Sequence, residues 1–231
     1  MTIDELQYYT LNFKFFYNDN DLSGKGCIRE IITNDVYKLY KYTNINNTII
    51  DIGGNHGLVS IILALQNPNA HIYIIEPYYE LINIITQNIT INNIQNITII
   101  NKALGDGNKV NLTIGNSCSG ASSTLVSEQN KFSNKQKGLK NVITEIESIT
   151  FDNLIDTYNI SQIELLKIDC EGGEYYLYDS LYFKNNIVKN IVGEFHNLNY
   201  NKQYTNWNST ELTNYVKKYV DGDIFLSYLT I

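Results

Sequence analysis

The sequence predicts an α/β fold: a doubly wound, mostly parallel sheet with helices on both faces and a β-hairpin insertion. Two observations indicate it. After roughly residue 45, short β-branched runs alternate with longer helical stretches, which is typical of βαβ units. Residues 48–52 form a nearly continuous apolar run that suits a strand buried on both faces. The 231 residues suffice for a single domain, with residues 1–45 expected as an N-terminal helical cap and 46–231 as the core.

The elements after this first strand can be placed in order. A glycine turn leads into a helix at residues 58–66, which Pro68 ends. A strand at 71–75 precedes a helix at 78–90, where Leu81, Ile82 and Ile85 have helical spacing. The same alternation resumes after residue 150. It predicts strands at 97–101, 163–168, 191–195 and 224–229, and helices at 151–157, 174–181 and 210–219.

Residues 105–150 interrupt this alternation. The stretch is rich in Gly and Ser at residues 117–123 and then polar, with several lysines, as far as Lys140. Such a composition predicts one or two hairpin strands with a long loop between them. The loop could act as a lid over an acceptor, although a disordered insertion explains its composition equally well.

Composition argues against a nucleic-acid partner and against a membrane span. The net charge is −7 and Arg29 is the single arginine, whereas phosphate backbones are bound by clustered Lys and Arg. The longest apolar run of a helical segment, residues 58–65, is far too short to cross a bilayer.

The cysteines and the N-terminus predict a cytoplasmic protein. Cys27, Cys118 and Cys170 include no C-x-x-C pair, which favours three reduced thiols over disulfides or a zinc site. Met1 to Glu5 have neither a basic start nor an apolar core, so no secretory signal is expected.

Acidic or glycine-bearing segments follow five of the predicted strands. In open α/β sheets, ligands bind beyond the carboxyl ends of the strands, near the switch in strand order. We therefore expect these segments to converge on one site. They are residues 51–57, Glu76, Asp106, residues 169–173 and residues 194–196.

The first of these segments predicts a ligand-binding turn. Asp51 closes a strand, and the turn that follows presents free backbone N–H groups at the positive end of a helix. Gly53 and Gly57 allow a ligand to approach the backbone closely. The spacing does not fit the G-x-G-x-x-G pattern of nicotinamide-binding folds. Taken alone, the turn is equally compatible with a purely structural role.

Glu76 adds a second indication. It ends the next strand, where a carboxylate can accept hydrogen bonds from both hydroxyls of an adenosine ribose. An exposed glutamate at a strand end can also be structural. Because both features occur in the expected order, we favour a ligand that carries an adenosine.

Two further segments contain candidate catalytic groups. Asp169, Glu171 and Glu174 place three carboxylates around one turn, which favours a site for a cation, a ligand or hydroxyls. Part of this turn can instead serve as a helix start. Glu194 and His196 share one face of a strand, so Glu194 could orient His196 as a general base. The pair together with Asp169 could also bind a divalent metal; we favour the base and expect no metal.

The order of these motifs resembles one known family. Residues 51–57, Asp-Ile-Gly-Gly-Asn-His-Gly, look like the glycine-rich loop of the FkbM-type methyltransferases. Residues 75–77, 103–106, 120–123 and 150–155 are similar to later segments of that family, in the same order. Residues 167–172, Lys-Ile-Asp-Cys-Glu-Gly, resemble its most specific stretch. The resemblance covers residues 49–196.

The resemblance implies a Rossmann-like sheet and transfer of a methyl group from S-adenosylmethionine, usually to an oxygen. The acceptor would be a hydroxyl of a small molecule, plausibly of a sugar or glycan. Asp51 would hold the amino group of the cofactor's methionine part. That part would lie on Gly53, Gly54, Asn55 and Gly57, with Asp169 nearby. Glu76 would bind the ribose, and Asp106 would lie near the adenine.

Gly54 and Gly173 depart from the family, which usually has Ala there. A single strand beyond Phe195 also suggests an incomplete form of the antiparallel edge hairpin common in the wider class. We expect His196 with Glu194, or else Asp169, to take the acceptor's proton. Two rival functions remain: a non-catalytic adenosine-ligand binding module of a larger glycan-modifying assembly, and a nicotinamide-linked oxidoreductase, which the glycine spacing disfavours.

Overall fold

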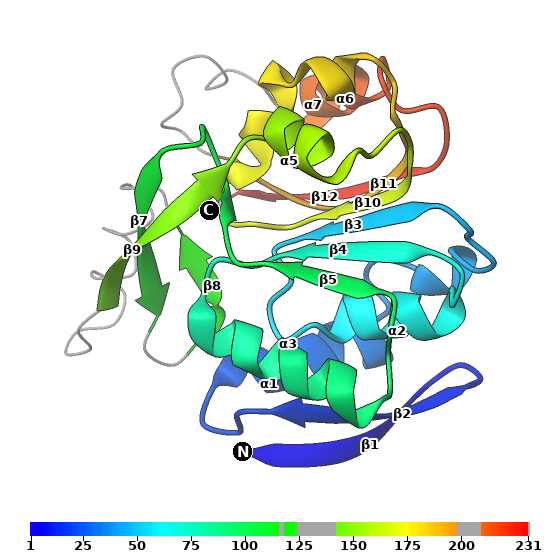
Figure 1. The fold of residues 1–231 in the computed structure, drawn as a ribbon, viewed down its shortest axis with the longest axis vertical. Helices are drawn as coiled ribbons and strands as arrows, with labels where there is room; N and C mark the ends of the chain where they lie inside the picture. The colour runs from blue at the N-terminus through cyan, green and yellow to red at the C-terminus, as the bar shows by residue number, and fades with distance from the viewer. Residues whose placement is uncertain (116–117, 124–141, 198–208, 231) are drawn as a thin grey trace.

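The centre of the molecule is a six-stranded parallel sheet (Figure 1). The computed structural model describes residues 1–115, 118–123, 142–197 and 209–230. Within them the sheet has the order β12-β11-β10-β3-β4-β5, and every neighbouring pair is parallel. The strands are β3 (Thr48–Ile52), β4 (His71–Ile75), β5 (Ile97–Ile100), β10 (Ile163–Ile168), β11 (Val188–Asn197) and β12 (Ile224–Thr230).

This order confirms the predicted α/β fold. Numbered along the chain within this sheet, the strands run 3-2-1-4-5-6, which is a doubly wound arrangement with its switch point between β3 and β10. Crossover connections of parallel strands place helices on both faces. The chain therefore leaves β3 and β10 toward opposite faces of the sheet, and a crevice forms at the carboxyl ends of these two strands. Such sheets bind their ligands in that crevice.

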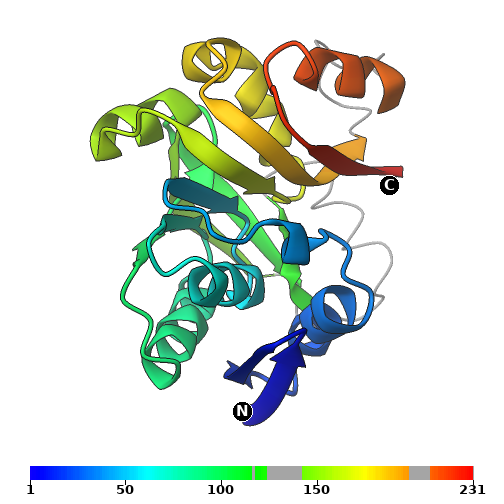
Figure 2. The same ribbon diagram turned by 90° about the vertical axis from the view of Figure 1, so that its right-hand side faces the viewer.

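Helices cover both faces of the sheet (Figures 1 and 2). One face carries α2 (Leu58–Gln66) and α3 (Tyr79–Ile91), and the other carries α5 (Phe151–Tyr158), α6 (Leu181–Lys184) and α7 (Ser209–Val216). Successive strand residues point to opposite faces, so Ile49 packs in the core beneath α2 and Ile50 in the core beneath α5. Both are fully buried, as the apolar sequence of β3 predicts.

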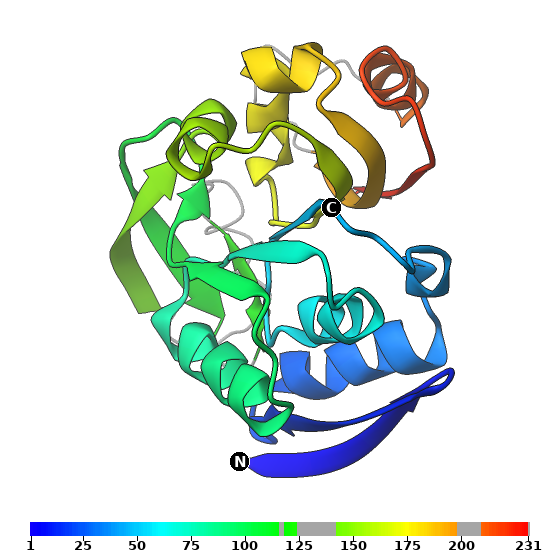
Figure 3. The same cartoon turned by 45° about the vertical axis from the view of Figure 1, so that its right-hand side comes forward.

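The N-terminal segment differs from the expected helical cap. It begins as an antiparallel hairpin of β1 (Thr2–Tyr8) and β2 (Leu11–Tyr17), which lies below α2 and α3 (Figure 3). Phe13, Phe15 and Tyr17 point into the core and alternate with more exposed residues. This period of two is typical of a β-strand and not of a helix. Helical turns follow only later: α1 (Leu22–Cys27), the π-helical η1 (Ile28–Thr33) and the 3-10 turn η2 (Leu39–Lys41).

The predicted hairpin insertion is present as part of a second sheet. Its strands are β6 (Ala103–Leu104), β7 (Lys109–Gly115), β8 (Cys118–Ser123) and β9 (Val142–Ile149), in the order β6-β9-β7-β8. β7 is antiparallel to both β8 and β9. The loop interpreted as a possible acceptor lid, 124–141, lies outside the described residues.

One predicted helix is replaced by two shorter elements. Residues 174–181 were expected as a helix, but the chain forms a 3-10 helix, η3 (Gly173–Asp179), before α6 begins. Ser180 separates them, because its extended backbone and its hydroxyl, which accepts from the Phe183 N–H, start a new helix. Among the described helices, none is long and apolar enough to span a membrane.

Candidate active site

A cavity of about 690 Å³, including its open mouth, lies at the carboxyl ends of β3, β4 and β10. It therefore occupies the switch point of the sheet, where the sequence predicts a ligand. Three groups of residues line it: the strand ends that carry the predicted motifs, the first turn of α2, and an N-terminal wall formed by Cys27, Glu30, Ile31 and Tyr37.

The glycine turn after β3 is shaped by contacts within the chain. Gly53 has a φ of +80°, and a Cβ placed there would lie 1.8 Å from the carbonyl oxygen of Asp169. A Cβ on Gly54 would lie 2.3 Å from Cγ2 of Ile74. Close approach is thus required at these two glycines by the chain itself: at Gly53 by the residue that follows β10, and at Gly54 by β4.

Three of the four predicted loop residues reach the cavity. Gly53, Gly54 and Asn55 line it, and the Asn55 N–H points to Glu76. Gly57 is not among the lining residues; with a φ of +83° it begins α2. The loop therefore offers backbone along one wall of the cavity, and its last glycine serves the helix start.

Glu76 is buried yet lines the cavity, with 5% of its surface exposed. Its Oε2 accepts the Asn55 N–H at 2.9 Å, and its Oε1 accepts the Tyr78 N–H at 2.8 Å. Burial raises the pKa of this carboxyl to about 7, and the two N–H groups oppose that shift. The backbone thus fixes both oxygens, and each has further lone-pair capacity for a ligand hydroxyl.

Asp51 lies behind the cavity and does not line it. It is fully buried; its Oδ2 accepts the Ser60 hydroxyl at 2.6 Å, and its Oδ1 lies 3.1 Å from Nζ of Lys167. Lys167 also donates to the carbonyl oxygen of Gly53 at 2.6 Å. Both carboxylate oxygens of Asp51 therefore face groups of the chain, which does not fit the direct ligand contact expected of it.

Asp169 lines the cavity opposite Glu76. Its Oδ2 accepts the hydroxyl of Tyr37 at 2.7 Å, a contact between residues 132 positions apart. Burial, followed by the negative charge of Asp169, raises the pKa of Tyr37 well above its usual range, so the phenol stays a donor. Tyr37 thereby fixes one oxygen of Asp169 at the cavity wall.

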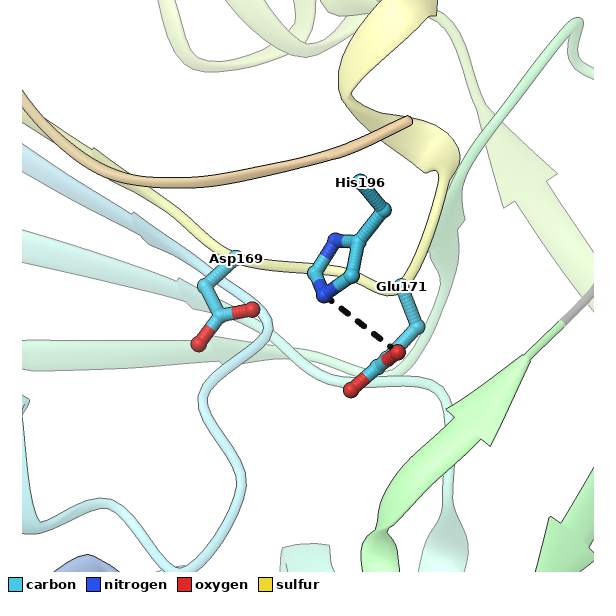
Figure 4. A group of neighbouring side chains, drawn as sticks. All are labelled: Asp169, Glu171 and His196. Atoms are coloured by element: carbon cyan, nitrogen blue, oxygen red, sulfur yellow. Dashed lines mark ion pairs between the residues drawn. The ribbon is translucent and has the colours of Figure 1, made fainter. Parts of the chain in front are cut away.

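His196 lies between two glutamates, Glu174 and Glu171; Figure 4 shows its contact with Glu171. Its Nδ1 is 2.8 Å from Oε1 of the fully buried Glu174, and its Nε2 is 3.4 Å from Oε2 of Glu171. Burial by itself would lower the pKa of the imidazole. The carboxylates of Glu174, Glu171 and Asp169 outweigh that effect and raise it to about 10. A raised pKa disfavours the neutral imidazole that the predicted role of a base requires.

Two other predicted residues, Glu194 and Asp106, do not line the cavity and make other contacts. Glu194 accepts the hydroxyl of Ser227 at 3.3 Å, so the carboxylate that orients His196 is Glu174 and not Glu194. Asp106 is exposed, accepts the N–H of Asn108 at 2.9 Å, and is not among the residues that line the cavity. It caps a turn in the segment that leads to β7.

A second, mostly apolar cavity of about 310 Å³ adjoins the first. Both are lined by Gly53, Pro77, Ser122 and Cys170, so they are neighbouring parts of one hollow. The remaining wall of the second is made by Ile52, Ile75, Ala103, Leu104 and Leu112. The site therefore combines a polar part, which holds carboxylates, with an apolar part.

Comparison with known proteins decides the family. The sequence profile described as "Methyltransferase FkbM domain" matches residues 51–221, about three quarters of the chain. This chain belongs to the FkbM methyltransferase family. It is accordingly an S-adenosylmethionine-dependent methyltransferase, as the ordered motifs predicted. Among proteins of curated function, none matches the chain by sequence.

Two solved structures resemble this FkbM methyltransferase. One, from Clostridium thermocellum, is provisionally described as an rRNA methylase; it has 10% identity and a TM-score of 0.46, with 87% of this chain and 82% of that chain covered. The other, from Streptococcus mutans, is provisionally described as a SAM-dependent methyltransferase. It has 11% identity and a TM-score of 0.38, with 94% of this chain and 45% of that chain covered.

Several cavity residues of this FkbM methyltransferase had not been predicted. Glu30 and Tyr37 precede the matched region, and no local pattern marks them. Lys167 did leave a signal, because a single lysine in an apolar strand next to Asp169 requires a buried partner. Glu171 and Glu174 had been noted as carboxylates of the turn, but their contacts with His196 depend on the pairing of β10 with β11.

Proposed function

We propose that this FkbM methyltransferase methylates a hydroxyl oxygen of a sugar or glycan acceptor. The observation that carries the proposal is the carboxylate-bearing cavity at the switch point, with Glu76 on one side and Asp169 and Glu171 on the other. A neutral, polyhydroxylated acceptor suits carboxylates that accept hydrogen bonds, whereas a net charge of −7 opposes an RNA or DNA acceptor. The free thiols of Cys27 and Cys170 support a reducing compartment such as the cytoplasm.

The two adjoining cavities fit the parts of S-adenosylmethionine. Glu76 would accept hydrogen bonds from the ribose hydroxyls, since backbone donors hold both of its oxygens in place. The apolar cavity beside Pro77 and Leu104 would take the adenine ring. Gly53 to Asn55 would provide the wall for the methionine part. Asp51 acts indirectly in this arrangement, because Lys167 joins it to the Gly53 carbonyl.

Asp169 is the group we assign to the acceptor's proton. S-adenosylmethionine, when bound, supplies an electrophilic methyl group on a charged sulfur. The acceptor hydroxyl must lose a proton as its oxygen gains the methyl group, and orientation of that hydroxyl provides much of the rate. Asp169 lines the cavity, and Tyr37 holds one of its oxygens. Glu194 is the alternative acceptor of the proton, and His196 acts as a positioning residue for Glu171.

Glu76→Gln tests the cofactor site. The amide keeps the size of the side chain, but only one of its two terminal atoms can accept hydrogen bonds. We therefore expect the affinity for S-adenosylmethionine, measured by calorimetry, to fall by a factor of about ten or more. Glu5→Gln, at an exposed position of β1, is the matched control and should bind as the wild type does. Equal affinity of both variants would show that Glu76 does not hold the ribose.

The acceptor class is tested separately. Wild-type protein, S-adenosylmethionine and a panel of free sugars and glycans are incubated, and formation of S-adenosylhomocysteine and of methylated product is measured. We expect turnover with at least one hydroxyl acceptor and a large loss of the turnover rate in Asp169→Asn, with the cofactor still bound. Methylation of nitrogen acceptors or RNA alone would contradict the proposed substrate class. Binding without any turnover would support the non-catalytic module.

A further inference from the structure

Three potential metal ligands meet at the inner edge of the cavity (Figure 4). One oxygen each of Asp169 and Glu171 and one ring nitrogen of His196 all lie within 4.8 Å of one another. A divalent ion sits about 2.0–2.2 Å from such atoms, so ligands of one ion lie roughly 3–4.4 Å apart. The 3.4 Å between Glu171 Oε2 and His196 Nε2 falls inside this range. Small side-chain movements would complete a coordination shell.

His196 provides an independent indication of a ligand. The ring is 2% exposed, and its Nδ1 is held by Glu174, which is itself fully buried. Its other nitrogen, Nε2, points to the carboxylates of the cluster (Figure 4). It makes no hydrogen bond within the part of the chain that the structure describes. A carboxylate behind a histidine in this way holds a proton on Nδ1, as is found behind metal-bound histidines. An ion at the cluster would displace the proton on Nε2 and take its electron pair.

The charges around the cluster also favour a cation. Asp169, Glu171 and Glu174 meet there, and Glu194 and Glu30 are close enough to influence Asp169 or Glu171 electrostatically. The nearest lysine, Lys167, is already committed to Asp51 and to the Gly53 carbonyl. A protonated His196 would supply one positive charge against these carboxylates, and partly buried carboxylates at this density stay costly unless further positive charge compensates them.

We propose that Asp169, Glu171 and His196 bind a divalent metal ion, with Glu174 as the outer residue that orients His196. Two carboxylate oxygens and one imidazole nitrogen suit Mn²⁺ and related first-row ions better than Ca²⁺. Three protein ligands leave open positions that face the cavity, where a hydroxyl could bind and become more acidic. With the ion bound, Asp169 acts as a ligand, and Glu194, the alternative named above, takes the proton. The sequence alone favours a site without a metal, and the alternative ligand set that it offers contains Glu194 in place of Glu171.

The test measures the binding of Mn²⁺ alone to full-length, chelator-treated protein without cofactor or acceptor. The concentration of unbound Mn²⁺ is followed by its electron paramagnetic resonance signal. We expect one bound ion per chain in the micromolar range. Glu171→Gln should weaken binding about tenfold or more, and Glu174→Gln should weaken it by a similar factor through His196. Glu5→Gln, at an exposed position of β1 outside the cavity, is the matched control and should change the affinity less than about twofold.

A second readout identifies the nitrogen ligand. Bound Mn²⁺ should show ¹⁴N modulation in pulsed spectra, and His196→Gln should abolish it; Asp169→Asn replaces Glu171→Gln if the latter fails to fold. Absence of binding up to millimolar Mn²⁺ would overturn the proposal, as would equal weakening by Glu171→Gln and Glu5→Gln. Since neither cofactor nor acceptor is present, this result is independent of the proposed methyl transfer.

Discussion

Lys167 shows how one residue connects the core with the site. Its ammonium group is buried, lies 3.1 Å from Oδ1 of Asp51 and donates to the carbonyl of Gly53 at 2.6 Å. The turn that lines the cavity therefore rests on a buried ion pair. Such a pair adds little to stability compared with apolar residues, but loss of one partner leaves an uncompensated charge.

Replacement of Lys167 should be strongly destabilising. We expect Lys167→Met to lower the free energy of unfolding by about 3–5 kcal/mol, because Asp51 is left buried without its cation. Adding Asp51→Leu should recover part of that loss. Lys189→Met removes an exposed lysine whose Nζ is 2.6 Å from Glu164, and it should cost less than about 1 kcal/mol. Urea denaturation of the four proteins checks these values; similar losses for the two lysine variants would refute the assignment.

At the scale of elements, the N-terminal segment completes the site. Tyr37 and Glu30 line the cavity although they precede the region that matches the FkbM family. Tyr37 reaches Asp169 from the loop between η1 and η2. The segment thus contributes directly to the polar wall and is more than a cover for α2 and α3.

Tyr37→Phe isolates this contribution. Without the hydroxyl, one oxygen of Asp169 loses its donor, and we expect the turnover rate to fall roughly tenfold with little change in cofactor affinity. Tyr9→Phe is a fitting control, since Tyr9 also donates to an aspartate, Asp35, but at an exposed position. Steady-state kinetics with S-adenosylmethionine would settle the matter: an unchanged rate in Tyr37→Phe would show that the contact is only structural.

The elements also show what the sequence could predict. β3, β4 and α2 were placed correctly, because runs such as Ile49–Ile50 and a helix stop at Pro68 are local signals. The hairpin β1–β2 was missed although Phe13, Phe15 and Tyr17 alternate with more exposed residues. A helix was expected at 174–181, where Ser180 instead starts a new one.

The site was predictable only in part. Gly53, Gly54, Asn55, Glu76 and Asp169 lie at strand ends that converge by the rules of parallel sheets, so their presence at one cavity could be expected. The partner of His196 could not be predicted, because Glu174 comes close to His196 only when β10 pairs with β11. The burial of Asp51 likewise depends on Lys167 from another strand. Local motifs identify the residues, whereas tertiary packing decides their partners.

At the scale of the whole molecule, two buried ionisable groups, Glu76 and His196, make the free energy of unfolding depend on pH. The pKa of Glu76 is raised from 4.5 to about 7. Its contribution to the free energy of unfolding is therefore complete below pH 4.5 and is lost as the pH rises through about 7. The pKa of His196 is raised from 6.5 to about 10, so its contribution is complete below pH 6.5 and is lost as the pH rises through about 10. Both effects have the same sign.

We therefore expect the protein without ligands to become less stable as the pH rises from about 6.5 to 10; below that interval the lowered pKa of buried His56 acts in the opposite direction. Glu76→Gln should flatten the part of this curve below about pH 7.5, while the decline above it persists. Urea denaturation at a series of pH values measures both curves. A wild-type stability that increases with pH over this interval would contradict the assignment of raised pKa values to these groups.

The strand order also bears on how the protein is made. β3, β4 and β5 leave the ribosome well before β10, yet the cavity needs Asp169 and Glu171 from the end of β10 opposite the turn at Gly53. A nascent chain that stops short of β10 lacks the wall of the site that carries Asp169 and Glu171. Because a ligand stabilises only the states that bind it, S-adenosylmethionine can assist folding only after the second half of the sheet has been synthesised.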